Sequence, residues 1–194
     1  MGVTYGSFST EVKDIQNRLD TASRTRLPRL RGEIGFSPVT MARVMEFQAQ
    51  ERLKPDGDVG PRTMARLRVR TGNQSMPVGR CILVDLINRR LRAFADGIVK
   101  LDIRPIIGGA RTSPTTRGVF KVTRRHRYHT SSKYPIPPGN MDFSLFFHGA
   151  EAIHQGPPEV PSHGCVHVGP GEAESLFNWA GRTDVRVIVI RSPG

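Results

Sequence analysis

Two histidines flank a cysteine in the segment PSHGCVHV, residues 161–168. Cys165 follows His163 and Gly164 directly, and His167 comes two positions later. A nucleophilic thiol needs a base that removes its proton and N–H groups that hold the negative oxygen formed on its substrate. Gly164 leaves space beside the thiol, and the N–H groups of Gly164 and Cys165 can point into one concavity. The segment therefore has the residue types of a thiol nucleophile.

The residues alone leave two other interpretations of Cys165 open. Cysteine is often buried as a small apolar side chain, so a structural thiol is one of them. Zinc binding together with His163, His167 or His148 is the other, although neighbours in a strand point to opposite faces and the spacing fits no usual zinc motif. The second cysteine, Cys81, opens the apolar run CILVDLI, which favours a buried thiol rather than a disulfide. We therefore expect no metal and no cofactor.

The expected secondary structure changes from helices to strands at the segment 71–79. This segment is polar and rich in Gly and Pro, as linkers are. Before it, apolar residues recur at spacings of three and four, which is typical of amphipathic helices. Pro61 suits the first turn of such a helix. The pattern predicts a small three-helix bundle within residues 1–70, with helices inside 9–20, 37–53 and 59–67.

After the linker the hydrophobic period changes to two, and residues 80–194 predict a mostly β domain with one helix. Turn signals at Asn88 and Asp96–Gly97 separate the first strands. Residues 124–147 have weak periodicity and three prolines, so we expect a long loop that acts as a lid or binding loop. The whole chain is thus expected to be α+β, with strands at 81–87, 90–96, 98–107, 118–125 and 183–191 and a helix at 171–181.

The charge of the chain is strongly basic, with 29 Lys+Arg against 17 Asp+Glu, which gives +12. Such a balance favours anionic partners: nucleic acid, acidic membranes or an acidic cell wall. Zinc-finger spacing, aromatic RNP-like strands and dense Lys/Arg runs are missing, so we expect no nucleic-acid partner. No apolar run is long enough to span a bilayer. No secretory signal is visible at the N-terminus, so either a leader has been removed or another export route is used.

The segment from His148 to Val168 resembles the catalytic motif of the L,D-transpeptidase family, the YkuD-type domain. That motif has a His-Gly pair, a gap of about a dozen residues and then Ser-His-Gly-Cys; here 13 residues separate His148 from Ser162. His154 lies too close to Ser162 to be the family histidine. Residues 108–120, GGARTSPTTRGVF, resemble the family's glycine turn and its Thr-Pro-x-Gly-x-Phe element. The resemblance covers about residues 79–191 and implies a β-sandwich with one helix.

The resemblance also implies roles for the residues of the motif. Cys165 is the nucleophile and His148 its base. His163 and Gly164 form the wall and the oxyanion hole, together with the Cys165 N–H. Substrate-binding or supporting roles fall to Ser162 in the turn, to Gly149 of the His-Gly pair, and to His167, which stands where the family often has Arg or Asn.

Basic residues in the expected loop supply one more hypothesis. Arg124, Arg125, Arg127 and Lys133 lie upstream of the motif, and we expect some of them, Arg124 and Arg125 above all, to bind carboxylates of the substrate. A solvated basic face is an equally open interpretation of the same residues.

The first part of the chain resembles a three-helix peptidoglycan-binding module, over about residues 9–69. We expect a tight turn at PDGDVGP that docks two helices, with Asp56 closing the turn and Gly57 supplying a positive φ. The resemblance rests on the core pattern of Phe47, Gln48, Leu53, Asp56, Gly57, Gly60, Thr63 and Leu67.

Both resemblances imply one polymer, peptidoglycan, and hence a location in the bacterial cell envelope, the periplasm or the wall. The implied donor is a stem tetrapeptide, and the implied acceptor is the amine of another stem, which gives a 3–3 cross-link. Water in place of the amine would trim the terminal D-alanine. Two alternatives remain open at this stage: an exported wall-targeting effector or phage-type lysin that uses the same site, and a catalytically inert peptidoglycan-binding protein.

Overall fold

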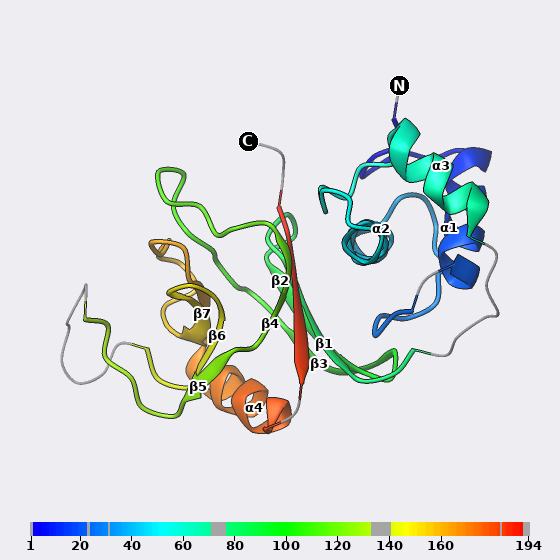
Figure 1. The fold of residues 1–194 in the computed structure, drawn as a ribbon. Coiled ribbons are helices and arrows are strands. Elements are labelled where there is room, and N and C mark those ends of the chain that lie inside the picture. Colours follow the sequence, from blue (N-terminus) through cyan, green and yellow to red (C-terminus); the bar gives the residue numbers. More distant parts are fainter. Residues whose placement is uncertain are drawn as a thin grey trace. The chain divides into compact units, whose positions relative to one another are not determined.

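The structure is a computed structural model, and it describes residues 2–22, 24–30, 32–70, 77–132, 141–182 and 184–191. The chain divides into two compact units, residues 1–81 with 94–98 and residues 82–93 with 99–194. Three helices belong to the first unit, and most of two sheets with a fourth helix belongs to the second (Figure 1). In the described part of the chain, no helix combines the length and the apolar character that crossing a bilayer requires.

The first unit contains the three predicted helices, α1 (Thr10–Ala22), α2 (Pro38–Gln50) and α3 (Pro61–Val69). The Ser37 side chain accepts a hydrogen bond from the Thr40 N–H and so caps α2. Pro61 occupies the first turn of α3, as predicted. The apolar faces of the helices meet in a core that includes Val12, Ile15, Leu19, Val44, Phe47 and Leu67.

The turn between α2 and α3 is organised by one buried amide, that of Gln48. Its Nε2 lies 2.9 Å from Asp56 Oδ1 and 3.2 Å from Thr63 Oγ1, and its Oε1 accepts from the Gly57 N–H at 2.8 Å. Asp56 also accepts from the Asp58 N–H at 3.1 Å, and Gly57 has a φ of +75°. Both predictions for this turn are confirmed, and Gln48 explains how the turn docks on α2 and α3.

The first sheet has five strands in the order β3-β2-β1-β9-β4. The predicted hairpin turn at Asp96–Gly97 is confirmed, because both residues have positive φ values, 51° and 76°. The strands are β1 (Arg80–Asp85), β2 (Arg90–Ala95), β3 (Ile98–Ile103), β4 (Gly118–Lys121) and β9 (Val185–Ile190).

The second sheet has four strands in the order β5-β6-β7-β8, which are β5 (Arg124–His126), β6 (Ser144–His148), β7 (Glu151–Gln155) and β8 (Val166–Val168). Strands β7 and β8 run parallel, while the other pairs are antiparallel. Helix α4 (Pro170–Ala180) follows β8 and ends at Gly181, as expected. One cluster of buried side chains joins both sheets and α4; its members include Ile82, Val84, Leu145, Phe147, Ile153, Val166, Val168, Leu176, Val187 and Val189.

The single strand predicted at residues 118–125 is wrong, because the chain changes sheets in the middle of it. The Val122 N–H donates to the Val185 carbonyl beside β9, whereas the Thr123 N–H donates to the Phe146 carbonyl in β6. The segment therefore forms β4 in one sheet and β5 in the other. The sequence has no Gly, Pro, Asn or Asp at this crossing, so no turn residue reveals it.

The long loop predicted at residues 124–147 is also wrong in extent. Strand β5 takes its first three residues, and β6 takes residues 144–147 at its end. Residues 133–140 of the expected loop and residues 71–76 of the expected linker lie outside the described part of the chain. Strands β7 and β8 were not predicted at all.

Candidate active site

His148 is the last residue of β6, at the edge of the turn that leads to β7. Between Phe146 and His148 the register with β7 shifts, as in a β-bulge, and a bulge re-aims the side chains that follow it. Gly149 then takes a φ of +53° and turns the chain back. The His148 ring is exposed, and its centroid lies 4.9 Å from that of Phe120 in β4. The base expected from the sequence thus sits at an accessible rim of the second sheet.

Cys165 directly precedes β8, the strand on the far side of β7 from β6. Val166 and Val168 point into the core, so the thiol projects from the opposite side of the strand. Its Sγ lies 3.8 Å from the carbonyl oxygen of Ala150, two residues after His148. Among the described residues, the thiol donates to this carbonyl and not to the His148 ring. The structure therefore brings Cys165 to the turn that begins at His148.

The two residues between Ser162 and Cys165 lie in a tight turn held by the serine hydroxyl. Ser162 is buried, and its Oγ donates to the Cys165 carbonyl at 2.6 Å and accepts from the Gly164 N–H at 3.0 Å. Gly164 has a φ of +118°, which L side chains rarely adopt. His163 is exposed beside it. The Gly164 N–H is thus already used by Ser162, whereas the family resemblance predicts it in an oxyanion hole.

A glycine-rich loop supports this turn from the other side. The backbone of residues 108–110 pairs with Ser162, through bonds of 3.1 and 2.8 Å. A Cβ atom on Gly109 would lie 2.7 Å from the Gly164 nitrogen, so only glycine permits this approach. The Thr115 hydroxyl accepts from the Gly109 N–H at 2.9 Å and lies 3.4 Å from the carbonyl oxygen of the cysteine. The glycine turn recognised in the sequence therefore braces the cysteine loop.

Glu151 is an acidic side chain beside the cysteine loop that was not among the predicted site residues. Its Oε1 accepts from the Thr116 hydroxyl at 2.6 Å, and its Oε2 accepts from the Thr116 N–H at 2.9 Å. A Cβ atom on Gly164 would lie 3.3 Å from Glu151 Cγ, so the carboxylate side chain runs along the cysteine loop. The one sign of Glu151 in the sequence was its position, three residues after the predicted base His148. Glu151 joins the β6–β7 turn, the glycine-rich loop and the cysteine loop.

The surroundings of Cys165 favour a neutral thiol in the resting protein. Burial raises the pKa of the Cys165 thiol, and the negative charge of Glu151 raises this pKa further. A hydrogen bond from the Ala152 backbone lowers the pKa but does not reverse the direction. The thiol consequently needs a base at the moment of reaction, since thiolate and not thiol is the nucleophile.

His167 makes local contacts rather than facing the thiol. Its Nδ1 lies 2.9 Å from the Val160 carbonyl and 3.2 Å from the Pro157 carbonyl, which ties β8 to the preceding loop. The centroid of its ring lies 5.0 Å from that of the His154 ring. Burial lowers the pKa of His154 to about 4. In the described part of the chain, no three His, Cys, Asp or Glu side chains are grouped so that they could hold a metal ion.

The basic residues expected at the substrate separate onto two sides of β5. Arg124 lies over the Phe146 ring at 4.6 Å and donates to the Gly149 carbonyl at 3.3 Å, which places it at the turn after His148. Arg125 lies over Phe177 of α4 at 4.0 Å and donates to the Phe177 carbonyl. The structure thus brings Arg124, but not Arg125, to the β6–β7 turn. Arg127 likewise pairs with α4, through Glu174, and Lys133 lies outside the described residues.

The chain thus combines a three-helix unit with a two-sheet domain in which a Ser-His-Gly-Cys turn precedes a parallel edge strand. Residues 79–189 match the family of the L,D-transpeptidase catalytic domain, and the chain belongs to this family. Residues 9–67 match a putative peptidoglycan binding domain. No curated protein matches the chain. Both domains support a peptidoglycan transpeptidase function and suggest a cell-wall location.

Several solved structures are similar to this one. An L,D-transpeptidase from Stackebrandtia nassauensis is 20% identical, with a TM-score of 0.54, and the match covers 99% of this chain and 98% of that one. One from Xylanimonas cellulosilytica is 28% identical, with 98% of each chain covered and a TM-score of 0.45. L,D-transpeptidase 1 of Mycobacterium tuberculosis is 17% identical over 58% of this chain and 62% of its own, with a TM-score of 0.49. The first of these confirms the predicted α+β class.

Proposed function

We propose that this protein acts on peptidoglycan stem peptides through a thioester on Cys165. The donor is a stem tetrapeptide, and the acceptor is the amine of another stem, which yields a 3–3 cross-link. Water as the acceptor trims the terminal D-alanine instead. The observation that carries the proposal is the placement of the Cys165 thiol, 3.8 Å from the carbonyl that lies two residues after His148.

The reaction has two stages: acylation of the Cys165 thiol, and transfer of the acyl group to the acceptor. The His148 imidazole takes the thiol proton, and the thiolate attacks the carbonyl carbon between the third stem residue and D-alanine. The C–N bond breaks, and the D-alanine amine leaves with the proton from His148. The acceptor amine then attacks the thioester and gives a proton to His148, the C–S bond breaks, and the Cys165 thiolate recovers that proton as an amide forms. The His148 ring is exposed and contacts the Phe120 ring on one side, so it has room to turn toward the thiol when substrate binds.

The remaining site residues support this reaction in the proposal. Because Ser162 occupies the Gly164 N–H, the oxyanion of the intermediate is held by the Cys165 N–H, with the exposed His163 as the wall of the site. Gly149 allows the turn after His148. His167 positions residues 157–160, which lead into the cysteine turn.

The organisation of the chain follows from the same proposal. Residues 1–70 form the peptidoglycan-binding domain, residues 80–194 the catalytic domain, and residues 71–79 the linker. Binding and catalysis on one polymer place the protein in the bacterial cell envelope, in the periplasm or the wall.

The deciding experiment is incubation of the full chain with a disaccharide-tetrapeptide, followed by mass spectrometry. We expect loss of D-alanine, formation of a cross-linked dimer, or both, and neither product with Cys165→Ala. His148→Ala should slow product formation by about 10²-fold or more while circular dichroism stays unchanged. Absence of both products with the intact chain would sink the proposal.

Labelling with a carbapenem distinguishes the enzyme from an inert binding protein. A covalent mass increase on the intact chain, absent in Cys165→Ala, shows that the thiol forms an acyl-enzyme. An intact chain that binds purified cell walls and stays unlabelled favours the inert alternative.

A further inference from the structure

The loop that leads from β7 to the cysteine turn is poor in backbone hydrogen-bond donors. Its residues 156–161 are GPPEVP, and the three prolines carry no N–H group. The N–H groups of Gly156 and Val160 donate to the carbonyls of Val168 and Pro157, at 3.0 and 3.2 Å. The loop must therefore be held mainly through its carbonyl oxygens, by donors from other parts of the chain.

Two side chains supply such donors. The Nδ1 atom of His167 lies within hydrogen-bond distance of two of these carbonyls. Arg89, in the turn between β1 and β2, donates from its Nη2 to the Pro158 carbonyl at 2.5 Å. The Nε of the same guanidinium donates to the Ile106 carbonyl at 3.1 Å. One arginine thus joins the proline-rich loop to the segment that begins at Ile106.

The segment 106–110 reaches the cysteine turn from its other side. Ile107 and His167 exchange two backbone hydrogen bonds, of 2.8 and 3.3 Å, and the backbone of residues 108–110 pairs with Ser162. The Ser162 hydroxyl in turn holds the Cys165 carbonyl. The two segments that fix the cysteine turn therefore meet at Arg89, which acts on the thiol through backbone and not by direct contact.

The backbone of Arg89 is unusual for an arginine. Its φ is +52°, in the left-handed region that favours glycine and asparagine. The turn itself is held by Asp85, whose Oδ1 accepts from the N–H groups of Ile87 and Asn88 at 3.1 Å each. The turn thus has its own support and a conformation that suits other residues better, so the guanidinium is the feature that an arginine adds here.

We infer that Arg89 is a positioning residue for the reaction at Cys165. It holds residues 106–110 and 156–161 in one arrangement, so that the thiol and the Cys165 N–H meet the substrate carbonyl in a fixed geometry. A displacement of about 1 Å at a reacting group can cost about 10²-fold in rate. The inference rests on the proposed function, because it concerns the same reaction.

The test is Arg89→Gly, which removes the guanidinium and relieves the backbone at a positive φ. On the disaccharide-tetrapeptide, kcat should fall about tenfold or more, and KM should stay within about twofold because Arg89 does not touch the substrate. Carbapenem labelling of the thiol should slow by a similar factor. Alkylation by iodoacetamide, which needs a thiolate but no oriented carbonyl, should keep its rate. The Tm should shift by less than about 3 °C.

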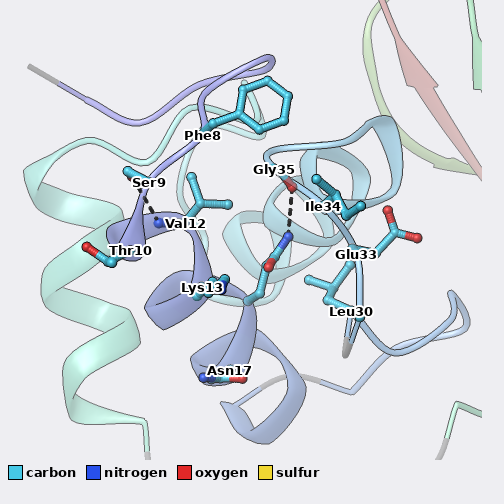
Figure 2. A pocket seen from close by; sticks show the side chains of 12 residues that line it. Phe8, Ser9, Thr10, Val12, Lys13, Asn17, Leu30, Glu33, Ile34 and Gly35 are labelled. Carbon is cyan, nitrogen blue, oxygen red and sulfur yellow. Dashed lines mark hydrogen bonds between the residues drawn. The ribbon is translucent and has the colours of Figure 1, made fainter.

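Arg89→Asn is the second variant, since asparagine also tolerates a positive φ, and it should behave like Arg89→Gly. Arg52→Gly is the matched control, because Arg52 is an exposed arginine with a φ of +58° in the first unit. The cavity of that unit lies between the start of α1 and residues 30–35 (Figure 2), and Arg52 is not among its lining residues. This control should keep the kcat of the wild type.

A wild-type kcat in either folded Arg89 variant would overturn the inference, as would a loss confined to KM or an equal loss in Arg52→Gly. Alkylation that slows in step with kcat would assign the effect to the thiol's ionisation or access, and unfolding of both Arg89 variants would assign a purely structural role. Failure of the proposed function shows in the wild type, as the absence of product and of carbapenem label. Failure of this inference alone shows as an active wild type with equally active Arg89 variants.

Discussion

The carboxylate of Glu151 lies where it opposes ionisation of the proposed nucleophile, because its negative charge raises the pKa of the Cys165 thiol. Glu151→Gln keeps the size of the side chain and an acceptor for Thr116 but removes the charge. The thiol pKa should therefore fall, and alkylation of Cys165 by iodoacetamide should become faster at neutral pH. The measurement is the alkylation rate from about pH 6 to 10, followed on the Cys165 peptide by mass spectrometry.

Glu159→Gln is the control for this prediction, since it removes the same charge from an exposed position in the loop before Ser162. Its alkylation profile should coincide with that of the wild type. A Glu151→Gln profile that stays in place, or moves to higher pH, would show that the charge does not act on the thiol.

Arg124 is the one described arginine of the expected set that the structure places at the β6–β7 turn. Arg124→Gln should lower kcat/KM on the tetrapeptide about tenfold through KM, because a charged hydrogen bond to a carboxylate is lost. Arg124→Lys should retain most of the activity, and Lys100→Gln on exposed β3 should retain all of it. The solvated-face interpretation holds instead if Arg124→Gln stays within twofold of the wild type.

At the scale of single residues, the sequence predicted identities better than hydrogen-bond partners. Cys165 and His148 were predicted as a pair because a thiol and a base at a family spacing have a chemical reason to occur together, and the structure brings Cys165 to the turn that begins at His148. The hydrogen bond from the Gly164 N–H to Ser162 could not be predicted, because it depends on the backbone conformation of Gly164, with a φ of +118°. The contacts of His167 with residues 157–160 could not be predicted either, because they depend on the path of that loop.

The turn between α2 and α3 depends on one side chain, which makes it the weak point of that element. Gln48→Ala removes the bonds to the turn and leaves buried polar groups without partners, so the free energy of unfolding should fall by about 2–4 kcal/mol. Urea denaturation followed by circular dichroism measures this. Gln50→Ala, two positions later and exposed, should cost less than about 0.5 kcal/mol. Equal losses for both variants would contradict the role given to Gln48.

At the scale of elements, helices and long strands were predictable and short buried strands were not. The three helices and β9 show clear periods and terminal residues such as Pro61. Strand β6 is buried at four of its five positions and β8 has only three residues, so neither shows alternation. Strand β5 was hidden because the chain changes sheets after Val122 and no turn residue in the sequence marks the change.

At the scale of the whole molecule, the charge of +12 suits a polymer that carries carboxylates and phosphates. Retention of the full chain on purified cell walls should therefore fall as salt rises from about 0.05 to 0.5 M, because screening shortens the reach of the charges. A sedimentation assay with washed walls measures this. Retention that is unchanged over this range would assign wall binding to uncharged contacts alone.

The extra residue in β6 before His148 has a consequence for any attempt to transplant or evolve this chemistry. In a strand, adding or losing a single position turns every later side chain over. Deleting one residue there would leave the histidine in the chain, at nearly the same place, yet pointing to the opposite face of the sheet. Two chains that share the motif residues therefore orient the histidine alike only when the number of strand residues before it also agrees.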